Sequence, residues 1–153
     1  MIMSRQEWRV EVPGWVPTSL NELVGNHAKA GRLKKRDART IAAACVLAGV
    51  PRVGLDAHER AHRKALAIVG PQPGDPTPRR RHVRLEVRLA KGERALDEDN
   101  YFKSLMDGLK RAGMLFEDSR QWATHDSTIA FTRGRDTWDR GCVIVLRDLE
   151  TLP

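Results

Sequence analysis

The sequence predicts an α+β fold, a small mixed β-sheet with helices packed on one face. Two stretches, residues 7–12 and 81–89, alternate apolar and charged side chains, which is the period of a strand with one buried face. Between residues 100 and 112 the apolar residues recur instead at helical spacing. The expected order is strand, helix, helix, strand, helix, strand and strand, which is typical of the α+β class.

Composition and charge limit the classes of partner. The 153 residues suit a single domain spanning residues 1–153 with its own hydrophobic core. Lys and Arg number 27 against 20 Asp and Glu, which gives a net charge of +7 and a pI near 10.0. This excess favours a polyanion, and nucleic acid before an anionic membrane, although many basic proteins bind neither.

Other features favour a soluble protein of a reducing compartment, the cytoplasm. No stretch approaches the roughly 18 apolar residues of a membrane helix, and residues 1–11 lack an apolar core followed by a cleavage site. Cys45 and Cys142 lie far apart in apolar runs, so that both are predicted to be buried and unpaired. We therefore expect no membrane partner and no disulfide.

The N-terminal part is predicted to form a strand and then a turn. In the strand, Trp8, Val10 and Val12 share one face because strand side chains repeat every two residues. A turn-rich segment over residues 15–21 follows, since Pro17 is incompatible with a regular helix interior.

A helix is predicted over residues 29–48, basic in its first half and apolar in its second. Gly49 and Pro51 supply its stop signals. The basic residues form either a solvated helix face or an arm that contacts phosphates, and both interpretations stay open. They are Arg32, Lys34, Lys35, Arg36 and Arg39.

The block over residues 50–78 is predicted to be an insertion or an exposed connector. Asp56 and Glu59 form a capping pair for a second helix that continues to Ile68. Four prolines fall between residues 71 and 78 out of the 8 in the chain. This part is therefore expected to be exposed and stiffened by proline rather than folded.

The second half adds three strands and the helix with the clearest apolar stripe. The strand over residues 81–89 has the cleanest alternation, and the helix over residues 100–112 is expected to pack on the sheet. Gly113 is its C-terminal stop. Two further strands are predicted around residues 127–133 and 142–148.

Acidic residues surround the start of the 100–112 helix. If the chain is still extended over residues 96–99, Asp97 and Asp99 point the same way and Glu98 points outward. Alternatively, an acid or Asn100 in this position is an ordinary helix cap. Each acid taken alone fits this structural explanation; it is the whole set, with the residues described next, that favours a site.

That set continues along the helix. Lys103 lies one turn after Asp99, and Asp107 one turn beyond, on the same helix face. If the chain runs back along the helix after Gly113, Asp118 returns to the beginning of the motif as a third carboxylate. Three crowded carboxylates raise one another's pKa unless a cation compensates.

A hard divalent cation suits this donor set. Carboxylates without His or Cys favour Mg²⁺, with Mn²⁺ as a possible substitute. A calcium loop fits poorly, because Tyr101 stands at a ligand position and Phe102 where the loop requires Gly. Metals of this kind activate water and stabilise charge on phosphorus oxygens, so a phosphodiester is the matching substrate in a basic protein.

At this point the pattern DxDNxxKxxxDxLxxAGxxxxD resembles the signature of the RusA family of Holliday-junction resolvases. The matching residues are Asp97, Asp99, Asn100, Lys103, Asp107, Leu109, Ala112, Gly113 and Asp118. The specific likeness covers residues 96–122, and the order of elements agrees over most of the chain. The segment over residues 17–21 is a weaker match to the family's N-terminal proline-serine-asparagine segment.

The resemblance implies a RusA-like fold and a homodimeric, Mg²⁺-dependent endonuclease of a bacterial cell or a phage-infected host. Such an enzyme binds four-way DNA junctions and resolves them by paired symmetric nicks. By residue match, Asp97, Asp99 and Asp118 are implied to bind metal, with Lys103 as the catalytic lysine. The supporting residues are Asn100, Asp107 and Glu117, which stands where the family often has a second Asp.

Basic residues leading into the motif, with those of the first helix, are predicted to contact DNA phosphates without reading sequence. They are Lys34, Lys35, Arg36, Arg79, Arg80, Arg81, Lys91 and Arg94. No aromatic residue lies between Arg79 and Leu96 to open a junction. Two alternatives remain, a restriction-type metal-dependent nuclease on duplex DNA and a non-catalytic junction-binding module.

Overall fold

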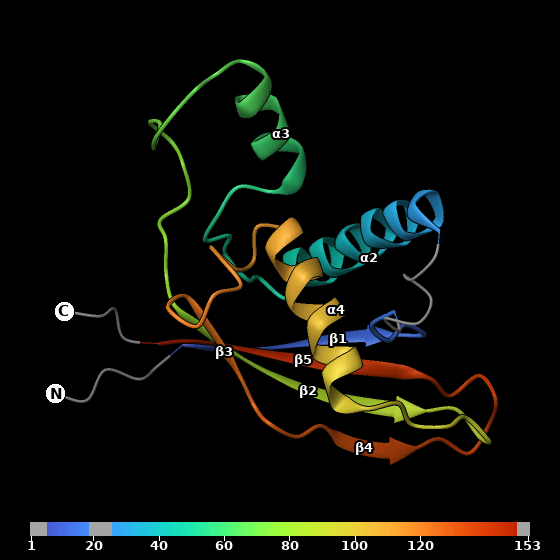
Figure 1. Cartoon of the computed structure of the whole chain (residues 1–153). Helices are drawn as coiled ribbons and strands as arrows, with labels where there is room; N and C mark the ends of the chain where they lie inside the picture. The colour runs from blue at the N-terminus through green and yellow to red at the C-terminus, as the bar shows by residue number, and fades with distance from the viewer. Residues whose placement is uncertain (1–5, 19–25, 150–153) are drawn as a thin grey trace, which may run out of the picture.

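The computed structural model describes residues 6–18 and 26–149, in which five strands and three helices form (Figure 1). In chain order they are β1 (Glu7–Pro13), α2 (His27–Leu47), α3 (Ala57–Ala65), β2 (Arg81–Leu89), α4 (Glu98–Arg111), β3 (Ala123–His125), β4 (Ala130–Arg133) and β5 (Gly141–Asp148).

All five strands belong to one mixed sheet. Its order is β1, β5 and β2, and the other edge of β2 pairs with β3 and then with β4. The pairs β1–β5 and β5–β2 are antiparallel, whereas β3 and β4 run parallel to β2. The prediction of an α+β fold with a small mixed sheet is confirmed.

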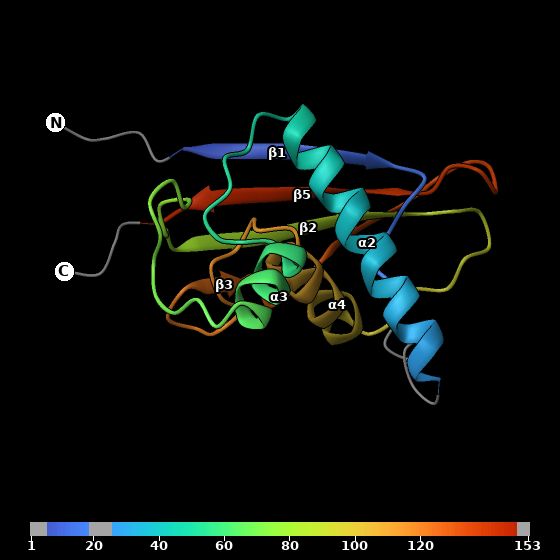
Figure 2. The same cartoon turned by 90° about the horizontal axis from the view of Figure 1, so that it is seen from above.

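Helices α2 and α4 pack against each other and cover one face of the sheet (Figures 1 and 2). The alternation predicted from the sequence decides which strand side chains meet them. In β1 the buried positions are Trp8, Val10 and Val12, as expected. The stripe of α4 buries Phe102 and Leu105 beneath it. The core therefore lies between the sheet and these two helices, and the opposite face of the sheet has no helix of the described residues on it.

Several element boundaries differ from the predicted ones for local reasons. Helix α3 has the expected capping box between Asp56 and Glu59, but it ends at Ala65 rather than Ile68. The helix cannot continue beyond this point because Ala67 has a φ of 54°, outside the right-handed helical region. Strand β3 was not predicted, since three residues are too few to show a period.

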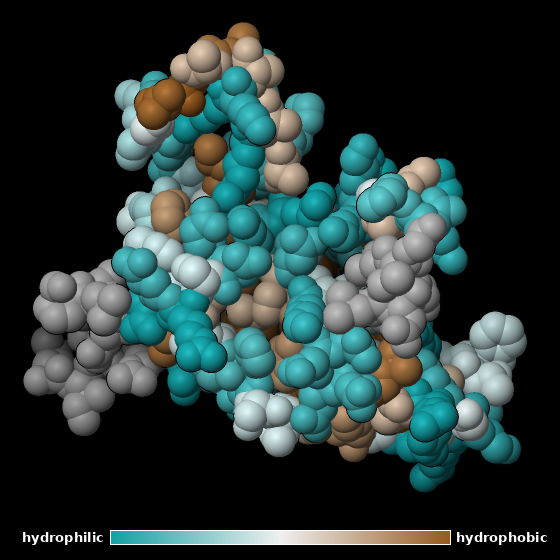
Figure 3. Space-filling model, viewed as in Figure 1, coloured by the Kyte–Doolittle hydropathy of each residue, from teal (hydrophilic) through white to brown (hydrophobic). Residues whose placement is uncertain are grey.

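The 50–78 block is anchored at its start and exposed beyond it. Val50 and Val53 are buried, whereas no residue of α3 is. An ion pair between Arg63 and Asp75 ties the proline-rich connector to α3 and lowers the pKa of Asp75 to about 2. Apolar side chains gather at the far end of α3 (Figure 3), among them Val69. Most of residues 71–78 are exposed, and they form neither helix nor strand.

Two smaller predictions can also be compared with the structure. Cys45 and Cys142 are both buried and free, and desolvation raises the pKa of each thiol to about 12. Of the predicted turn over residues 15–21, the part from residue 19 onward lies outside the described residues. Within the described ranges, no helix has the length and apolar character needed to cross a membrane.

Candidate functional site

The first turn of α4 presents the acidic motif to solvent. The helix begins at Glu98 with Asp97 as its N-cap residue, and the Asp97 side chain makes no capping hydrogen bond. Asp99 lies in the first turn, where the helix dipole favours negative charge. Asp97 therefore occupies the N-cap position, but its side chain does not act as a cap.

The path into this turn differs from the predicted one. Strand β2 ends at Leu89, and a loop over residues 90–97 carries the chain from the sheet to α4. Asp97 and Asp99 are therefore placed by the start of a helix, not by the two-residue repeat of an extended strand, and that prediction was wrong. The chain needs a loop to pass from the sheet to the layer of helices above it, and the alternation of side chains in the strand does not reveal that loop.

Three side chains of the motif are exposed around this turn, namely Asp97, Asp99 and Lys103. Among the described residues, none of the three forms an ion pair, so the two negative charges are not neutralised by a protein cation there. Lys103 follows Asp99 by one helical turn, which places the two side chains on neighbouring positions of one face. Asn100, beside them, is half-buried.

The buried side of α4 fixes the orientation of this face. Tyr101 is 2% exposed, with its ring centroid 5.8 Å from that of Phe131 on β4. Phe102 stacks on His125 with centroids 4.2 Å apart. Because two consecutive aromatic rings are locked against the sheet, the preceding and following polar residues are directed to solvent. Figure 3 shows that much of the surface over this helix is hydrophilic.

The other end of α4 also carries acids, but these are paired. The Arg111 Nε donates to Asp107 Oδ2 at 2.9 Å, so Asp107 is held at the helix's last turns. Lys110 Nζ lies 3.1 Å from Glu117 Oε2 and 3.8 Å from Asp118 Oδ1. Glu117 is also in contact with Arg60 at 3.4 Å.

Asp118 consequently lies toward the end of α4 rather than at its beginning. Lys110 follows Asp99 by eleven residues, which is about 16 Å along a helix axis. Figure 1 shows the segment after α4 running away from the helix's first turn. The predicted return of Asp118 to the start of the motif within one chain was therefore wrong, whereas its role as a metal ligand is a separate prediction that this geometry does not test.

Docking of the turn after α4 explains this path. Gly113 has a φ of 78°, and a Cβ on it would lie 2.7 Å from the Gly54 carbonyl oxygen, so only glycine fits. The Gly113 carbonyl oxygen accepts from the Val53 amide at 2.9 Å, and Arg60 donates to the Phe116 carbonyl oxygen at 2.8 Å. The segment is thereby held against residues 53–60 instead of running back along α4.

The donor set at the first turn matches a hard cation in chemistry but supplies few ligands. Asp97 and Asp99 offer carboxylate oxygens in solvent, which Mg²⁺ accepts together with water. Within residues 6–18 and 26–149, no three His, Cys, Asp or Glu side chains are gathered closely enough to hold a metal ion. The three-carboxylate Mg²⁺ site stays a prediction.

The basic residues predicted to contact DNA separate into two groups in space. Lys34, Lys35 and Arg36 lie in the first half of α2, while Lys91 and Arg94 are exposed on the loop before α4. By contrast, the residues before β2 lie at the far end of that strand, about 30 Å from Leu89. These are Arg79, which is exposed, and Arg80, which is half-buried.

Arg81 is a correction to the predicted DNA contacts. Its side chain is fully buried, and its Nε donates to Asp148 Oδ1 at 2.8 Å. Its Nη1 donates to the Met114 carbonyl oxygen at 3.0 Å, and the guanidinium lies over the Trp8 ring. A group so enclosed cannot reach a phosphate. It joins β2, β5 and the segment after α4 instead, a role that a run of three arginines does not reveal.

The sequence predicts a loop containing Gly134, Asp136 and Gly141 between the last two strands, and the structure has a loop over residues 134–140 between β4 and β5. What the sequence does not reveal is the position of this loop beside the candidate site. Gly134 donates its amide to the Leu89 carbonyl oxygen at 2.8 Å, and Lys91 donates its amide to the Asp136 carbonyl oxygen at 3.0 Å. This loop therefore flanks the start of the loop before α4. Its Trp138 side chain is 90% exposed, and no periodic signal surrounds it in the sequence.

No family model matches this chain, and a search of curated proteins finds no match either. The likeness to the RusA family therefore remains a resemblance carried by the motif residues.

Proposed function

We propose that the protein is a metal-dependent endonuclease that binds four-way DNA junctions and resolves them by paired symmetric nicks. The observation that carries the proposal is the first turn of α4, where the exposed carboxylates of Asp97 and Asp99 have no ion-pair partner among the described residues. The exposed Lys103 follows Asp99 by about one helical turn. The spacing of the motif around these residues is that of the RusA signature. The net charge of +7 adds attraction for a polyanion.

In the proposed site, the aspartates would hold Mg²⁺, which when bound activates a water and stabilises charge on the phosphorus oxygens. Asp97 and Asp99 are exposed to solvent and are placed by the start of a helix whose other side is packed in the core. Lys103 would bind the scissile phosphate or the leaving oxygen as a cation. Asp118 is the proposed third ligand, and it would have to approach the first turn of α4 from its present position.

The proposed partners follow from the substrate. A four-way junction has approximate two-fold symmetry, so paired symmetric nicks call for two sites related in the same way and hence for a homodimer. Lys91 and Arg94, on the loop that leads into α4, are proposed to contact phosphates near the site. Lys34, Lys35 and Arg36 would contact a second segment of backbone.

The test compares a synthetic four-way junction with a linear duplex of the same sequence, with and without Mg²⁺. We expect nicks in the junction only when Mg²⁺ is present. Asp99→Asn should lower the nicking rate by about a hundredfold or more, since even an outer partner of a bound metal contributes 10- to 100-fold. Junction binding in EDTA should persist, because the substitution keeps the side chain's shape.

Glu98→Gln is the matched control, because it removes the same charge one residue away and should leave nicking unchanged. Nicking that survives Asp97→Asn, Asp99→Asn and Asp118→Asn together would refute the proposal. Equal cutting of the linear duplex would instead identify a restriction-type nuclease. Junction binding that depends on salt but not on Mg²⁺, without nicks at any metal concentration, would identify a non-catalytic binding module.

A further inference from the structure

The loop over residues 134–140 displays a tryptophan on the surface. Trp138 is 90% exposed, whereas Trp8 is 9% exposed and the side chains of Trp15 and Trp122 are partly buried. A fully solvated indole leaves a large apolar ring face in contact with water, and such rings serve as contact points for a ligand. Trp138 is the one tryptophan of the chain that the fold does not use for packing.

The loop that carries Trp138 is itself built by hydrogen bonds. Asp139 accepts the Arg135 amide at 3.0 Å on its Oδ2, and its own amide donates to the Asp136 carbonyl oxygen at 3.2 Å. Gly134 lies against Asp139 so closely that a Cβ would overlap it. The indole is therefore presented by a defined turn that includes its neighbours on both sides.

The last residue of β4, Arg133, and the last residue of the loop, Arg140, bind the stretch that leads into the candidate site. Arg133 Nη1 donates to the Ala90 carbonyl oxygen at 3.0 Å and to the Glu93 carbonyl oxygen at 2.8 Å. Arg140 Nε donates to Glu93 Oε2 at 3.0 Å. Trp138 thus belongs to the same end of the molecule as the loop that precedes Asp97, although it is 41 residues further along the chain.

Near Trp138, exposed cations that form no ion pair among the described residues outnumber the exposed anion Asp136. Lys91 and Arg94, on the neighbouring loop, and Arg135, within the same loop, are exposed and form no ion pair within the described ranges. Cations of this kind attract a phosphate backbone without distinguishing its sequence.

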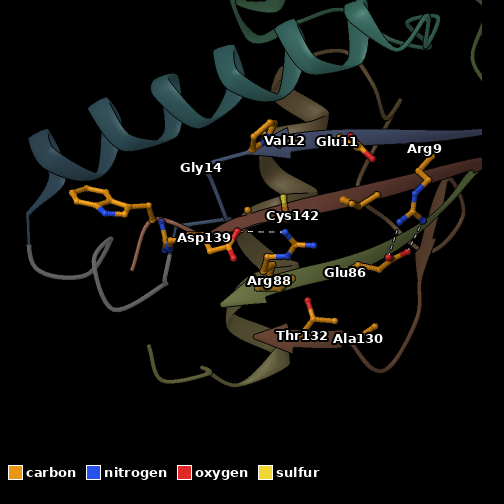
Figure 4. Close-up of a pocket in the computed structure, with 16 residues that line it drawn as sticks. Arg9, Glu11, Val12, Gly14, Glu86, Arg88, Ala130, Thr132, Asp139 and Cys142 are labelled. Atoms are coloured by element: carbon orange, nitrogen blue, oxygen red, sulfur yellow. Dashed lines mark hydrogen bonds and ion pairs between the residues drawn. The ribbon is translucent and has the colours of Figure 1, made fainter. Parts of the chain in front are cut away.

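Trp138 also borders a hollow of about 460 Å³ on the face of the sheet that α2 and α4 do not cover (Figure 4). Three arginines line it, namely Arg9, Arg88 and Arg140, the last of which is paired with Glu93. Arg88 is paired with Asp139 at 3.5 Å, and Arg9 is paired with Glu86 at 2.9 Å. Figure 4 shows both pairs bridging neighbouring segments across the hollow. Glu11 also lines the hollow, and each of its arginines is paired with a carboxylate. Among the described residues, the cations without an ion pair therefore lie around the loop rather than in the hollow.

The geometry points to a stacking site in which the Trp138 indole receives an unpaired nucleobase, while Lys91, Arg94 and Arg135 contact the phosphates beside it. This inference rests on the proposed function and adds to it the recognition of an unstacked base next to the cutting site. An exposed aromatic ring among cations is the combination that binds single-stranded nucleic acid with little sequence preference. At a four-way junction, such bases are available at the crossover when a pair opens.

The test measures binding in EDTA, so that it does not depend on cleavage. The probes are a single-stranded oligonucleotide of about twenty residues and a blunt duplex of the same sequence. Trp138→Ala should weaken binding of the single strand by about tenfold, because stacking contributes this much per base, and should change duplex binding little. Trp138→Phe should keep most of the wild-type affinity for the single strand, since it keeps an aromatic ring at this position.

Leu47→Ala is the control, because Leu47 is also 90% exposed but lies on α2. It should bind both probes as the wild type does. Equal single-strand affinity for Trp138→Ala and wild type would overturn the inference, as would an equal loss in Leu47→Ala. Failure of the proposed function is a separate result, the absence of Mg²⁺-dependent nicking by the wild type, and it is read in a different assay.

Discussion

The two ends of helix α4 carry acids of the same type in opposite electrostatic surroundings. At its first turn, Asp97 and Asp99 are exposed and form no ion pair with any cationic side chain of the described residues. At its last turns and just beyond, Asp107 and Glu117 are held by Arg111 and Lys110. The same helix therefore separates carboxylates that stabilise the fold from carboxylates that are available to a ligand.

The difference arises from what each end packs against. The last turns of α4 meet the segment over residues 52–60, which brings Arg52 and Arg60 to that end. The first turn follows the exposed loop over residues 90–97, and the cations of that loop form no ion pair with the motif. A surface carboxylate without a neutralising partner adds little to the stability of the fold. The same carboxylate is available as a ligand for a metal ion.

The strongest way to break this comparison is to substitute neighbouring acids at the paired end. Asp118→Asn should lower junction nicking about a hundredfold if the motif's third carboxylate is a metal ligand, as the resemblance implies. Glu117→Gln should leave nicking nearly unchanged, because it removes only a contact to Lys110 and Arg60. Rates are measured on the same junction in Mg²⁺.

The two variants share the Lys110 contact, so their difference isolates the motif role of Asp118. A loss in Asp118→Asn alone would require that Asp118 reaches the first turn of α4 in the bound state or is supplied by a second copy. Equal and small effects would reduce the site to the first turn of α4 and would remove Asp118 from it.

The two lysines of α4 sharpen the comparison. Lys103→Ala should lower nicking by about a hundredfold if Lys103 has its proposed role, because a cation that stabilises charge in the transition state would be lost. Lys110→Ala should leave the rate unchanged and reduce the free energy of unfolding by no more than about 1 kcal/mol, as expected for a partly exposed ion pair. Single-turnover rates and urea unfolding give the two readouts. A rate loss in Lys110→Ala as large as that in Lys103→Ala would contradict the separation of the two ends.

The smallest expected effect is a pH dependence at the paired end. Hydrogen bonding by Arg52 lowers the pKa of Glu59 from 4.5 to about 2. A lowered pKa in the folded state means that the stabilisation is complete above the unfolded-state pKa and is lost as pH falls through about 2. Glu59→Gln should therefore lower the urea midpoint at about pH 6 and do so progressively less at more acidic pH. A difference from wild type that grows on acidification would contradict this assignment.

Much of the fold could be predicted because it depends on local periods. The alternation in β1 and β2 selected the correct buried faces, and the apolar stripe located α4 to within two residues at its start. The capping pair of α3 also formed as predicted. Strand β3 and the end of α3 were beyond prediction, since a three-residue strand has no period and the Ala67 φ depends on the turn that follows.

For the candidate site, the sequence by itself determined which residues form the motif and that three of them, Asp97, Asp99 and Lys103, lie close together around the start of a helix. Only the structure decided that this helix begins at Glu98. Only the tertiary structure decided which acids are neutralised, because ion pairs such as Arg60 with Glu117 join residues far apart in the chain. It likewise buried Arg81 and brought the Trp138 loop to the stretch before α4. Local periods fix the faces of helices and strands, whereas charge pairing depends on contacts that only packing creates.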